Sequence, residues 1–102
     1  MIARVWRGVA RTEEADAYVR HLLNDTFPAL GCIAGFVDAT IWRRDVALGV
    51  EFTIVTRWES IDAIRRFAGE PVDAAVVPPE VGAMMLTYDD KVAHYEVAWA
   101  SS

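Results

Sequence analysis

The chain has 102 residues, of which 54% are hydrophobic, and it carries 15 acidic against 10 basic residues for a net charge of −5. This length predicts a single domain spanning residues 1–102, and the acidic balance without a basic cluster excludes a general nucleic-acid binder. The lone cysteine, Cys32, excludes an intrachain disulfide.

Hydrophobic periodicity predicts a strand, a helix, a strand hairpin, a second helix and two short extended segments. In chain order, we expect these elements at residues 1–7, 12–30, 35–44, 50–58, 60–68, 84–88 and 91–99. Residues 8–11 form a predicted turn after the first strand. Gly31 is the expected end of the first helix, and Pro28 is expected to kink its last turn or end it early.

The second helix has clear predicted ends, whereas the segment that follows it is harder to assign. Ser60 is the expected N-cap and Gly69 the expected C-terminal stop. Residues 72–77 fit one further helical turn, which we expect Pro78 and Pro79 to end, because two consecutive prolines forbid a continuing helix.

The resulting order, β-α-β-β-α-β with an extra extended piece before the last strand, predicts an α+β fold of the ferredoxin-like class. Both helices would lie on one face of an antiparallel sheet, so the opposite face needs another cover. The high apolar content favours a homodimer, with two sheets facing each other in a dimeric α+β barrel. A richly packed monomer is the alternative.

Nothing in the sequence predicts export or membrane insertion. Residues 1–7 carry charges within a strand-like run and do not resemble a signal peptide. The longest uncharged stretch, residues 26–37, is too short to span a bilayer. We therefore expect a soluble, cytoplasmic protein.

Trp58 occupies the most informative position in the chain. It ends the alternating run of residues 50–58 and is followed at once by Glu59 and the predicted N-cap Ser60. A large indole therefore lies where a strand ends and a helix begins, a place where it can form the wall of a cavity between the two.

The predicted strand faces bring several aromatic side chains and one cation together. Trp58 and Phe52 share one face of the third strand, while Trp6 and Arg4 share one face of the first. If both faces point toward the helices, these side chains and Tyr18 line one pocket that suits an aromatic ligand. Arg4 would stabilise a phenolate or enolate there. For both tryptophans, packing in the core or a dimer interface is the alternative.

His94 is the stronger acid–base candidate of the two histidines. A histidine can take a proton from a phenol near neutral pH, and Glu96 on the same strand face could orient its ring. A surface His–Glu pair is the alternative reading. His21, within the first helix, is expected to be mostly solvated. No metal site is predicted, because the two histidines and Cys32 lie far apart without a ligand spacing.

Three segments resemble the antibiotic biosynthesis monooxygenase domain family. They are residues 1–8 (Met-Ile-Ala-Arg-Val-Trp-Arg-Gly), residues 56–60 (Thr-Arg-Trp-Glu-Ser) with residues 67–70 (Phe-Ala-Gly-Glu), and residues 92–97 (Val-Ala-His-Tyr-Glu-Val). The resemblance runs over nearly the whole chain, and the Trp-Glu-Ser segment is its most specific part. It implies a homodimer of ferredoxin-like subunits.

The resemblance also implies an activity, because some members oxygenate phenolic compounds to quinones with O₂ and without metal or flavin. Trp58 stands where such enzymes place a tryptophan at the pocket. We expect an oxidoreductase of this cofactor-free type, acting on a small aromatic substrate. His94 would transfer protons, Arg4 would stabilise the anion, and Trp58 would stack on the substrate. Three further side chains are expected to bind it: Trp6, Tyr18 and Phe52.

Two alternatives stay open. Other members of the family bind and degrade haem, but they use an asparagine on the first strand, where this chain has Trp6, and a histidine after the second helix. Residues 74–77 there are Ala-Ala-Val-Val, so the usual protein ligand of haem iron is missing. The other alternative is a dimeric small-molecule-binding or stress-response module without turnover.

Overall fold

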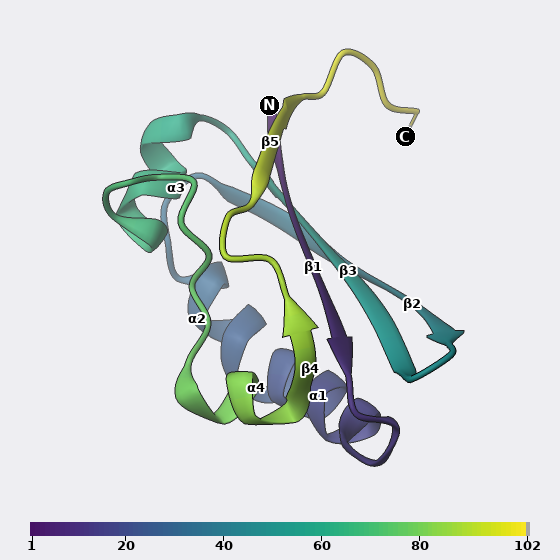
Figure 1. Ribbon diagram of the computed structural model, residues 1–102. Helices are drawn as coiled ribbons and strands as arrows, with labels where there is room; N and C mark the ends of the chain where they lie inside the picture. The colour runs from purple at the N-terminus through teal and green to yellow at the C-terminus, as the bar shows by residue number, and fades with distance from the viewer. Residues whose placement is uncertain (102) are drawn as a thin grey trace.

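A five-stranded antiparallel sheet forms the framework of the protein, and the computed structural model describes residues 1–101 (Figure 1). The sheet order is β2-β3-β1, and β4 and β5 both pair with the outer edge of β1. The strands are β1 (Ile2–Ala10), β2 (Phe36–Val46), β3 (Gly49–Trp58), β4 (Met85–Tyr88) and β5 (Ala93–Glu96). This confirms the predicted α+β, ferredoxin-like fold and the extra extended piece.

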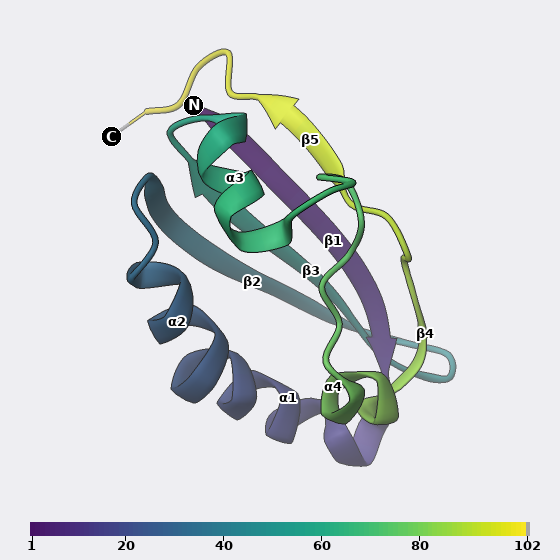
Figure 2. The same ribbon diagram turned by 90° about the vertical axis from the view of Figure 1, so that its left-hand side faces the viewer.

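The helices lie together on one face of the sheet (Figure 2), with α3 in front of β1 and β3 and the long first helix running beside β2. The helical segments in chain order are η1 (Thr12–Glu14), α1 (Ala15–His21), η2 (Leu22–Thr26), α2 (Phe27–Gly31), α3 (Ile61–Ala68) and α4 (Pro79–Met84). The first four follow one another without a break and end at Gly31, as predicted.

A π-helical turn, η2, accommodates Pro28 inside the long helix. Proline has no amide hydrogen, and its ring crowds the carbonyl one turn earlier, so an unbroken α-helix is not available there. The backbone widens instead, and the N–H of Phe27 donates to the carbonyl oxygen of Leu22, a bond that spans five residues. The expected kink or early end at Pro28 is therefore replaced by a wider turn before it.

Strand β1 is longer than predicted, because residues 8–11 do not form a turn. Its ladder with β3 runs to the pair Ala10–Val50. A side chain on Gly8 would bring a Cβ atom within 2.7 Å of the Trp6 indole, so glycine lets that indole fold back along its own strand. The prediction failed because glycine was interpreted as a turn signal rather than as room for a neighbouring side chain.

The ends of α3 agree with the sequence. The Ser60 side chain accepts a hydrogen bond of 3.1 Å from the Ala63 N–H, which is the N-cap contact. Gly69 ends the helix with a φ of 72°, a left-handed value that favours glycine.

The prediction for Pro78 and Pro79 was wrong. The two prolines do not end a helical turn; they begin α4, with Pro79 as its first residue. A proline fits the first helical turn because the N–H it lacks would have no partner there. The preceding segment, residues 70–78, has no helix, so the further turn expected at residues 72–77 is absent; it has one isolated bridge, between Ala74 and Lys91.

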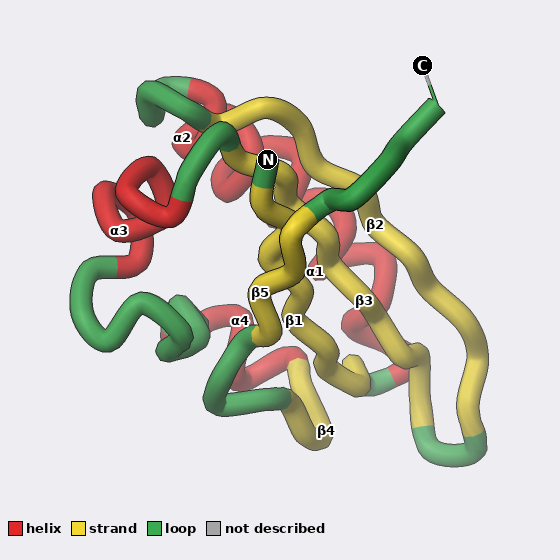
Figure 3. The backbone as a smooth tube through the Cα atoms, turned by 90° about the horizontal axis from the view of Figure 1, so that it is seen from above, coloured by secondary structure: helices red, strands yellow, loops and turns green. Residues whose placement is uncertain are grey.

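The core lies between the sheet and the helices. The predicted strand faces are confirmed, because the residues at alternate positions of β3 from Val50 to Trp58 are buried against the helices, and β1 presents Arg4 and Trp6 on the same side. Viewed from above, β5 lies beside the start of β1 and β4 beside its end (Figure 3). The opposite face carries half-buried and exposed side chains, including Trp42, which is 58% exposed.

Candidate functional site

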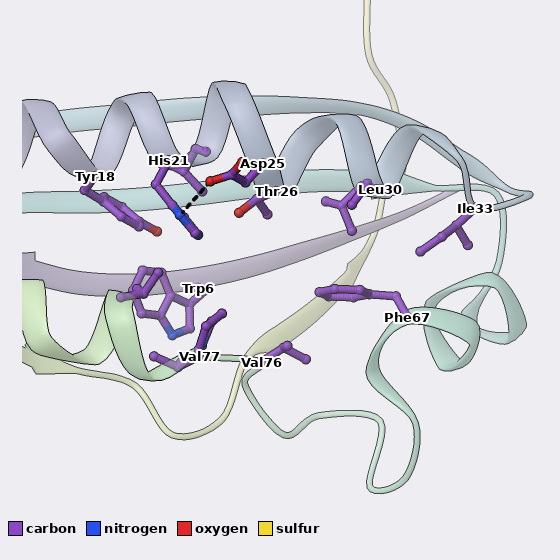
Figure 4. A pocket seen from close by; sticks show the side chains of 14 residues that line it. Trp6, Tyr18, His21, Asp25, Thr26, Leu30, Ile33, Phe67, Val76 and Val77 are labelled. Atoms are coloured by element: carbon purple, nitrogen blue, oxygen red, sulfur yellow. Dashed lines mark ion pairs between the residues drawn. The ribbon is translucent and has the colours of Figure 1, made fainter.

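A cleft opens between the long first helix and β1, closed at one end by α3 and bordered by residues 76–78 (Figure 4). It has an outer chamber of about 300 Å³ and an inner chamber of about 80 Å³. Both chambers share the side chains Trp6, Tyr18, Leu22, Thr26, Leu30, Phe67 and Val76. The shared lining makes them two parts of one mostly apolar cleft.

Three aromatic side chains form the walls. Trp6 projects from β1, Tyr18 from α1 and Phe67 from α3 (Figure 4). The Trp6 and Tyr18 ring centroids are 6.2 Å apart, and the Trp6 indole N–H donates a 3.0 Å hydrogen bond to the carbonyl oxygen of Asp89. That bond fixes the indole plane from outside the cleft, so the wall is formed before any ligand arrives.

Two of the aromatic residues singled out from the sequence lie behind these walls. Trp58 is fully buried, and its indole N–H donates a 2.9 Å bond to the Thr56 hydroxyl. Phe52 is also fully buried and meets Tyr18 edge to face, with centroids 4.9 Å apart. Neither lines the cleft in the described residues. Trp58 stacks on Phe67, and Phe52 packs against Tyr18. Each buried ring therefore affects the cleft indirectly, by positioning one of its wall residues.

Arg4 borders the inner chamber and is only 5% exposed. Its guanidinium donates to the carbonyl oxygens of Val72 (2.7 Å) and Ala74 (2.9 Å), and thus holds the irregular segment against the sheet. Burial lowers the pKa of Arg4, and the charge of Asp73 partly opposes this. An arginine stays protonated nonetheless. The inner end of the cleft therefore carries a fixed positive charge.

His94 contacts the Arg4 guanidinium and not the Glu96 carboxylate. Arg4 and His94 are paired residues of β1 and β5, and Nη1 of Arg4 lies 3.0 Å from Nε2 of His94. Because arginine only donates, Nε2 accepts, and the ring is neutral in this bond. Burial and then the Arg4 charge lower the pKa of His94. Glu96 is exposed on the same strand and forms no hydrogen bond to His94 among residues 1–101.

Tyr18 lines both chambers as a neutral phenol. Burial raises its pKa well above the usual value of 10.0. A phenol that keeps its proton is a hydrogen-bond donor, and it can stabilise an oxyanion formed on a bound ligand.

The sequence analysis missed His21, which was expected to be solvated. Its side chain is only 14% exposed and lines the outer chamber, and its Nδ1 lies 3.3 Å from Oδ2 of Asp25. A usable signal was present in the sequence. His21 follows the cleft residue Tyr18 by three positions and precedes Asp25 by four, which places all three on adjoining turns of one helix face.

Within residues 1–101, no group of three or more His, Cys, Asp or Glu side chains comes close enough to hold a metal ion. Among the same residues, no helix has both the length and the apolar character needed to cross a membrane.

The chain resembles known proteins in its three-dimensional structure. No family model matches the sequence, and no curated protein matches it. Solved structures do match: a candidate antibiotic biosynthesis monooxygenase from Bacillus cereus has a TM-score of 0.67 at 17% identity, covering 99% of this chain and 94% of its own. The chain has the antibiotic biosynthesis monooxygenase fold.

Two further structures agree. A candidate antibiotic biosynthesis monooxygenase from Deinococcus radiodurans has a TM-score of 0.64 at 19% identity and covers 100% of this chain and 97% of its own. The haem-degrader MhuD from Mycobacterium tuberculosis, solved with two haems in its active site, has a TM-score of 0.62 at 16% identity and covers 100% of both chains. The fold is thus shared by proteins of different named activities, so the activity has to be argued from the cleft.

Proposed function

We propose that the protein oxidises a small, ionisable aromatic molecule with O₂, without a metal or organic cofactor, inside this cleft. The observation that carries the proposal is the combination of three aromatic walls, Trp6, Tyr18 and Phe67, with the buried charge of Arg4 at the inner end. The named monooxygenases that share the fold support it.

The cleft suits a small aromatic ligand. Its outer chamber of about 300 Å³ is at the low end of the range for small-molecule sites, which favours a compact ring system. Flat aromatic walls bind such rings by stacking and edge contacts. Arg4 and the neutral Tyr18 hydroxyl supply the few polar groups that fix its orientation.

The chemistry proposed balances with O₂ as the only co-reactant. A substrate with an activated CH₂ group loses a proton to a base, and the anion passes one electron to O₂. The two radicals combine to a peroxide, which takes up the proton and loses water, so that CH₂ and O₂ become C=O and H₂O. The protein contributes a dry cleft, orientation and stabilisation of the anion.

His94 has a positioning role in this proposal. Its Nε2 lone pair, which a proton acceptor would use, already accepts from Arg4. We propose that the neutral ring holds the guanidinium toward the inner chamber, where Arg4 stabilises the substrate anion. Trp58 and Phe52 contribute in the same indirect way, by holding Phe67 and Tyr18 in place.

Haem is the alternative cofactor, and the lining does not fit it. A haem carries two anionic propionates, yet no lysine or arginine among residues 1–101 lines the outer chamber, and its one carboxylate, Asp25, stands beside the His21 ring. In the described part of the chain, His21 is the only imidazole of this lining that could bind the iron, and Asp25 would repel the propionates. No step of the proposed reaction uses haem.

We also propose that the protein is a homodimer. The face of the sheet away from the helices presents Val5 paired with Val55, together with Trp42 and Tyr95, which are 58% and 57% exposed. These side chains form an apolar patch, and the ion pairs Arg44–Glu51 and Arg57–Asp38 lie on the same face. An exposed apolar patch with a polar rim is typically covered by a partner. A second copy of the chain offers the same face, so the two surfaces match by symmetry.

The test of the proposed function is oxygen uptake by the metal-free protein with 1,8-dihydroxyanthrone as the probe. We expect uptake that is clearly reduced in Phe67→Ala, because removing the wall weakens probe binding by about 1–3 kcal/mol. Phe36→Ala is the matched control: Phe36 also contacts the Trp58 ring but does not line the cleft, so probe binding should be kept.

Three other results would redirect the proposal. Tight probe binding without oxygen uptake would favour the binding module over the enzyme. A strong Soret shift on haem titration without uptake would favour the haem-degrading alternative. No binding of the phenol or haem would remove the cleft as the functional site.

A further inference from the structure

His21 is the side chain of the outer chamber best suited to accept a proton. The polar residues lining this chamber are His21, Asp25, Thr26 and Tyr18. Of these, the imidazole offers a ring nitrogen lone pair that can accept a proton and later return it. Tyr18 holds its proton because burial raises its pKa, and the carboxylate of Asp25 is 70% exposed and lies at the rim.

The His21 ring is held in a defined orientation. Its Nδ1 lies 3.3 Å from the Asp25 carboxylate, and its side chain is only 14% exposed. Because a carboxylate only accepts, this contact favours the neutral tautomer with its hydrogen on Nδ1. Nε2 then carries the lone pair. Figure 4 shows the ring projecting from the helix toward the strand that carries Trp6, with the Tyr18 hydroxyl and Thr26 on the same side.

The two histidines differ in whether that lone pair is available. Nε2 of His94 is 3.0 Å from an Arg4 nitrogen and is occupied. Among residues 1–101, Nε2 of His21 has no hydrogen-bond partner, and its ring borders a chamber of about 300 Å³. The atom that can take a proton from a bound molecule therefore belongs to His21.

The π turn adds a second, independent feature at this position. It begins at Leu22, directly after His21, and includes Asp25 and Thr26. Leu22 and Thr26 line the cleft while Asp25 stays beside His21 at its rim. Single π turns within α-helices are frequently found at functional sites. Pro28, which imposes the turn, thereby helps to position His21 and Asp25.

We propose that His21 is the catalytic proton acceptor of the cleft and that Asp25 is its positioning partner. This inference rests on the proposed function, because it takes the bound aromatic molecule as the proton donor. The C–H or O–H bond of the substrate breaks, its electron pair stays on the substrate, and the proton forms an N–H bond at Nε2. The products are the substrate anion and an imidazolium next to Asp25.

Charge placement supports this division of roles. The anion forms between two cations, the imidazolium at the outer chamber and Arg4 at the inner one. Asp25 balances the imidazolium and keeps the ring in place, as carboxylates do beside catalytic histidines. Since Asp25 is 70% exposed, it also connects the ring to solvent, where the proton can exchange between turnovers.

Anaerobic absorbance spectroscopy separates proton transfer from oxygenation. With 1,8-dihydroxyanthrone bound and O₂ absent, the wild-type protein should show the absorbance band of the probe anion at pH 7. In His21→Gln the probe should bind with a dissociation constant within about threefold, yet the anion band should be absent. On admitting O₂, uptake should fall by about 100-fold, the usual contribution of a general base.

Asp25→Asn provides a second variant that does not threaten folding, because Asp25 is exposed. We expect kcat to fall with KM nearly unchanged, since a positioning partner acts on the proton transfer and not on binding. Asp16→Asn is the matched control. Asp16 is an acid of the same helix outside the cleft, so the anion band and uptake should stay at wild-type levels.

Each outcome decides between the proposals. An anion band that persists in His21→Gln, or an unchanged kcat in Asp25→Asn, overturns the assignment of His21 while the proposed function stands. An anion band that depends on His21 but leads to no oxygen uptake supports the assignment and overturns the oxygenase. If the wild-type protein neither binds nor ionises the probe, both proposals fail.

Discussion

The Phe67 ring lies nearly parallel to the Trp58 indole, with centroids 5.9 Å apart and planes 20° from parallel. The guanidinium of Arg4 lies 5.7 Å from the centroid of the same phenyl ring. Phe67 lines the cleft, whereas Trp58 is fully buried behind it. The tryptophan that stands out in the sequence thus affects the site through Phe67. The main expected effect of removing it is a lower free energy of unfolding.

Trp58→Ala should lower the free energy of unfolding by about 3–5 kcal/mol, because it replaces a large, fully buried side chain with a methyl group and leaves a cavity. Urea denaturation measures this directly. Trp99→Ala is the matched control: Trp99 is 82% exposed, so the same substitution should change stability by less than about 0.5 kcal/mol. Equal effects of both substitutions would contradict the burial of Trp58.

Arg4→Lys should loosen the irregular segment after α3. A lysine ammonium is one nitrogen, and it cannot take the places of the two guanidinium nitrogens that reach the Val72 and Ala74 carbonyls separately. We expect a loss of about 1–3 kcal/mol, the usual cost of leaving a buried acceptor without its partner. Amide hydrogen exchange should reveal it locally, as faster exchange at Ala75 and Val92, whose amides tie this segment to residues 90 and 73.

Arg65→Lys is the control for that measurement. Arg65 pairs with Asp62 and Glu70 on the surface, where ion pairs contribute little. Exchange at Ala75 and Val92 should be unaffected. If both amides also stay protected in Arg4→Lys, contacts other than the Arg4 hydrogen bonds hold the segment in place. Arg4 would then have no structural role in this segment.

The stability of the protein should fall as the pH drops below about 6.5, and His94 is the cause. Its pKa is lowered in the folded state by burial and by the Arg4 charge, from a usual value of 6.5. The unfolded chain therefore binds the proton first, so the stabilising contribution is complete above pH 6.5 and is lost as the pH falls toward the folded-state pKa. Asp38, with a pKa lowered by Arg57 from 3.8, acts in the same direction at more acidic pH.

Urea denaturation at pH 7.5 and pH 5.0 tests this for the wild-type protein and His94→Gln. A glutamine can still accept from Arg4 through its side-chain oxygen, but it does not titrate. The variant should lose most of the difference between the two pH values. An unchanged difference would assign the pH dependence to another group.

The order of elements could be predicted from the sequence because local signals and tertiary packing agree. Ser60 caps α3, Gly69 ends it, and the alternation up to Trp58 matches a strand with one buried face. The errors arose where one local signal has two physical meanings. Gly8 makes room for an indole instead of a turn, and Pro79 starts a helix instead of stopping one.

The candidate site was harder to predict than the fold. Alternation along β1 placed Arg4 and Trp6 on one face, and the structure brings this face against Tyr18 of α1, so that all three side chains line the inner chamber. Alternation predicts which side of the sheet a residue faces, but not which helical side chains cover it. The sequence therefore could not place Trp58 behind Phe67. His21 was missed because a polar residue beside exposed positions is typical of a solvated helix face.

Val55→Glu tests the proposed dimer. Val55 pairs with Val5 in β1 and with Thr40 in β2, at the centre of the sheet face that the helices leave uncovered. A carboxylate there would have to be desolvated between two sheets, which costs several kcal/mol. We expect the wild-type protein to sediment as a dimer and Val55→Glu as a folded monomer. Leu23→Glu, at a 56% exposed position on the helical layer, should remain dimeric. A dimer that survives Val55→Glu would place the interface elsewhere, and a monomeric wild-type protein would show that this sheet face needs no partner.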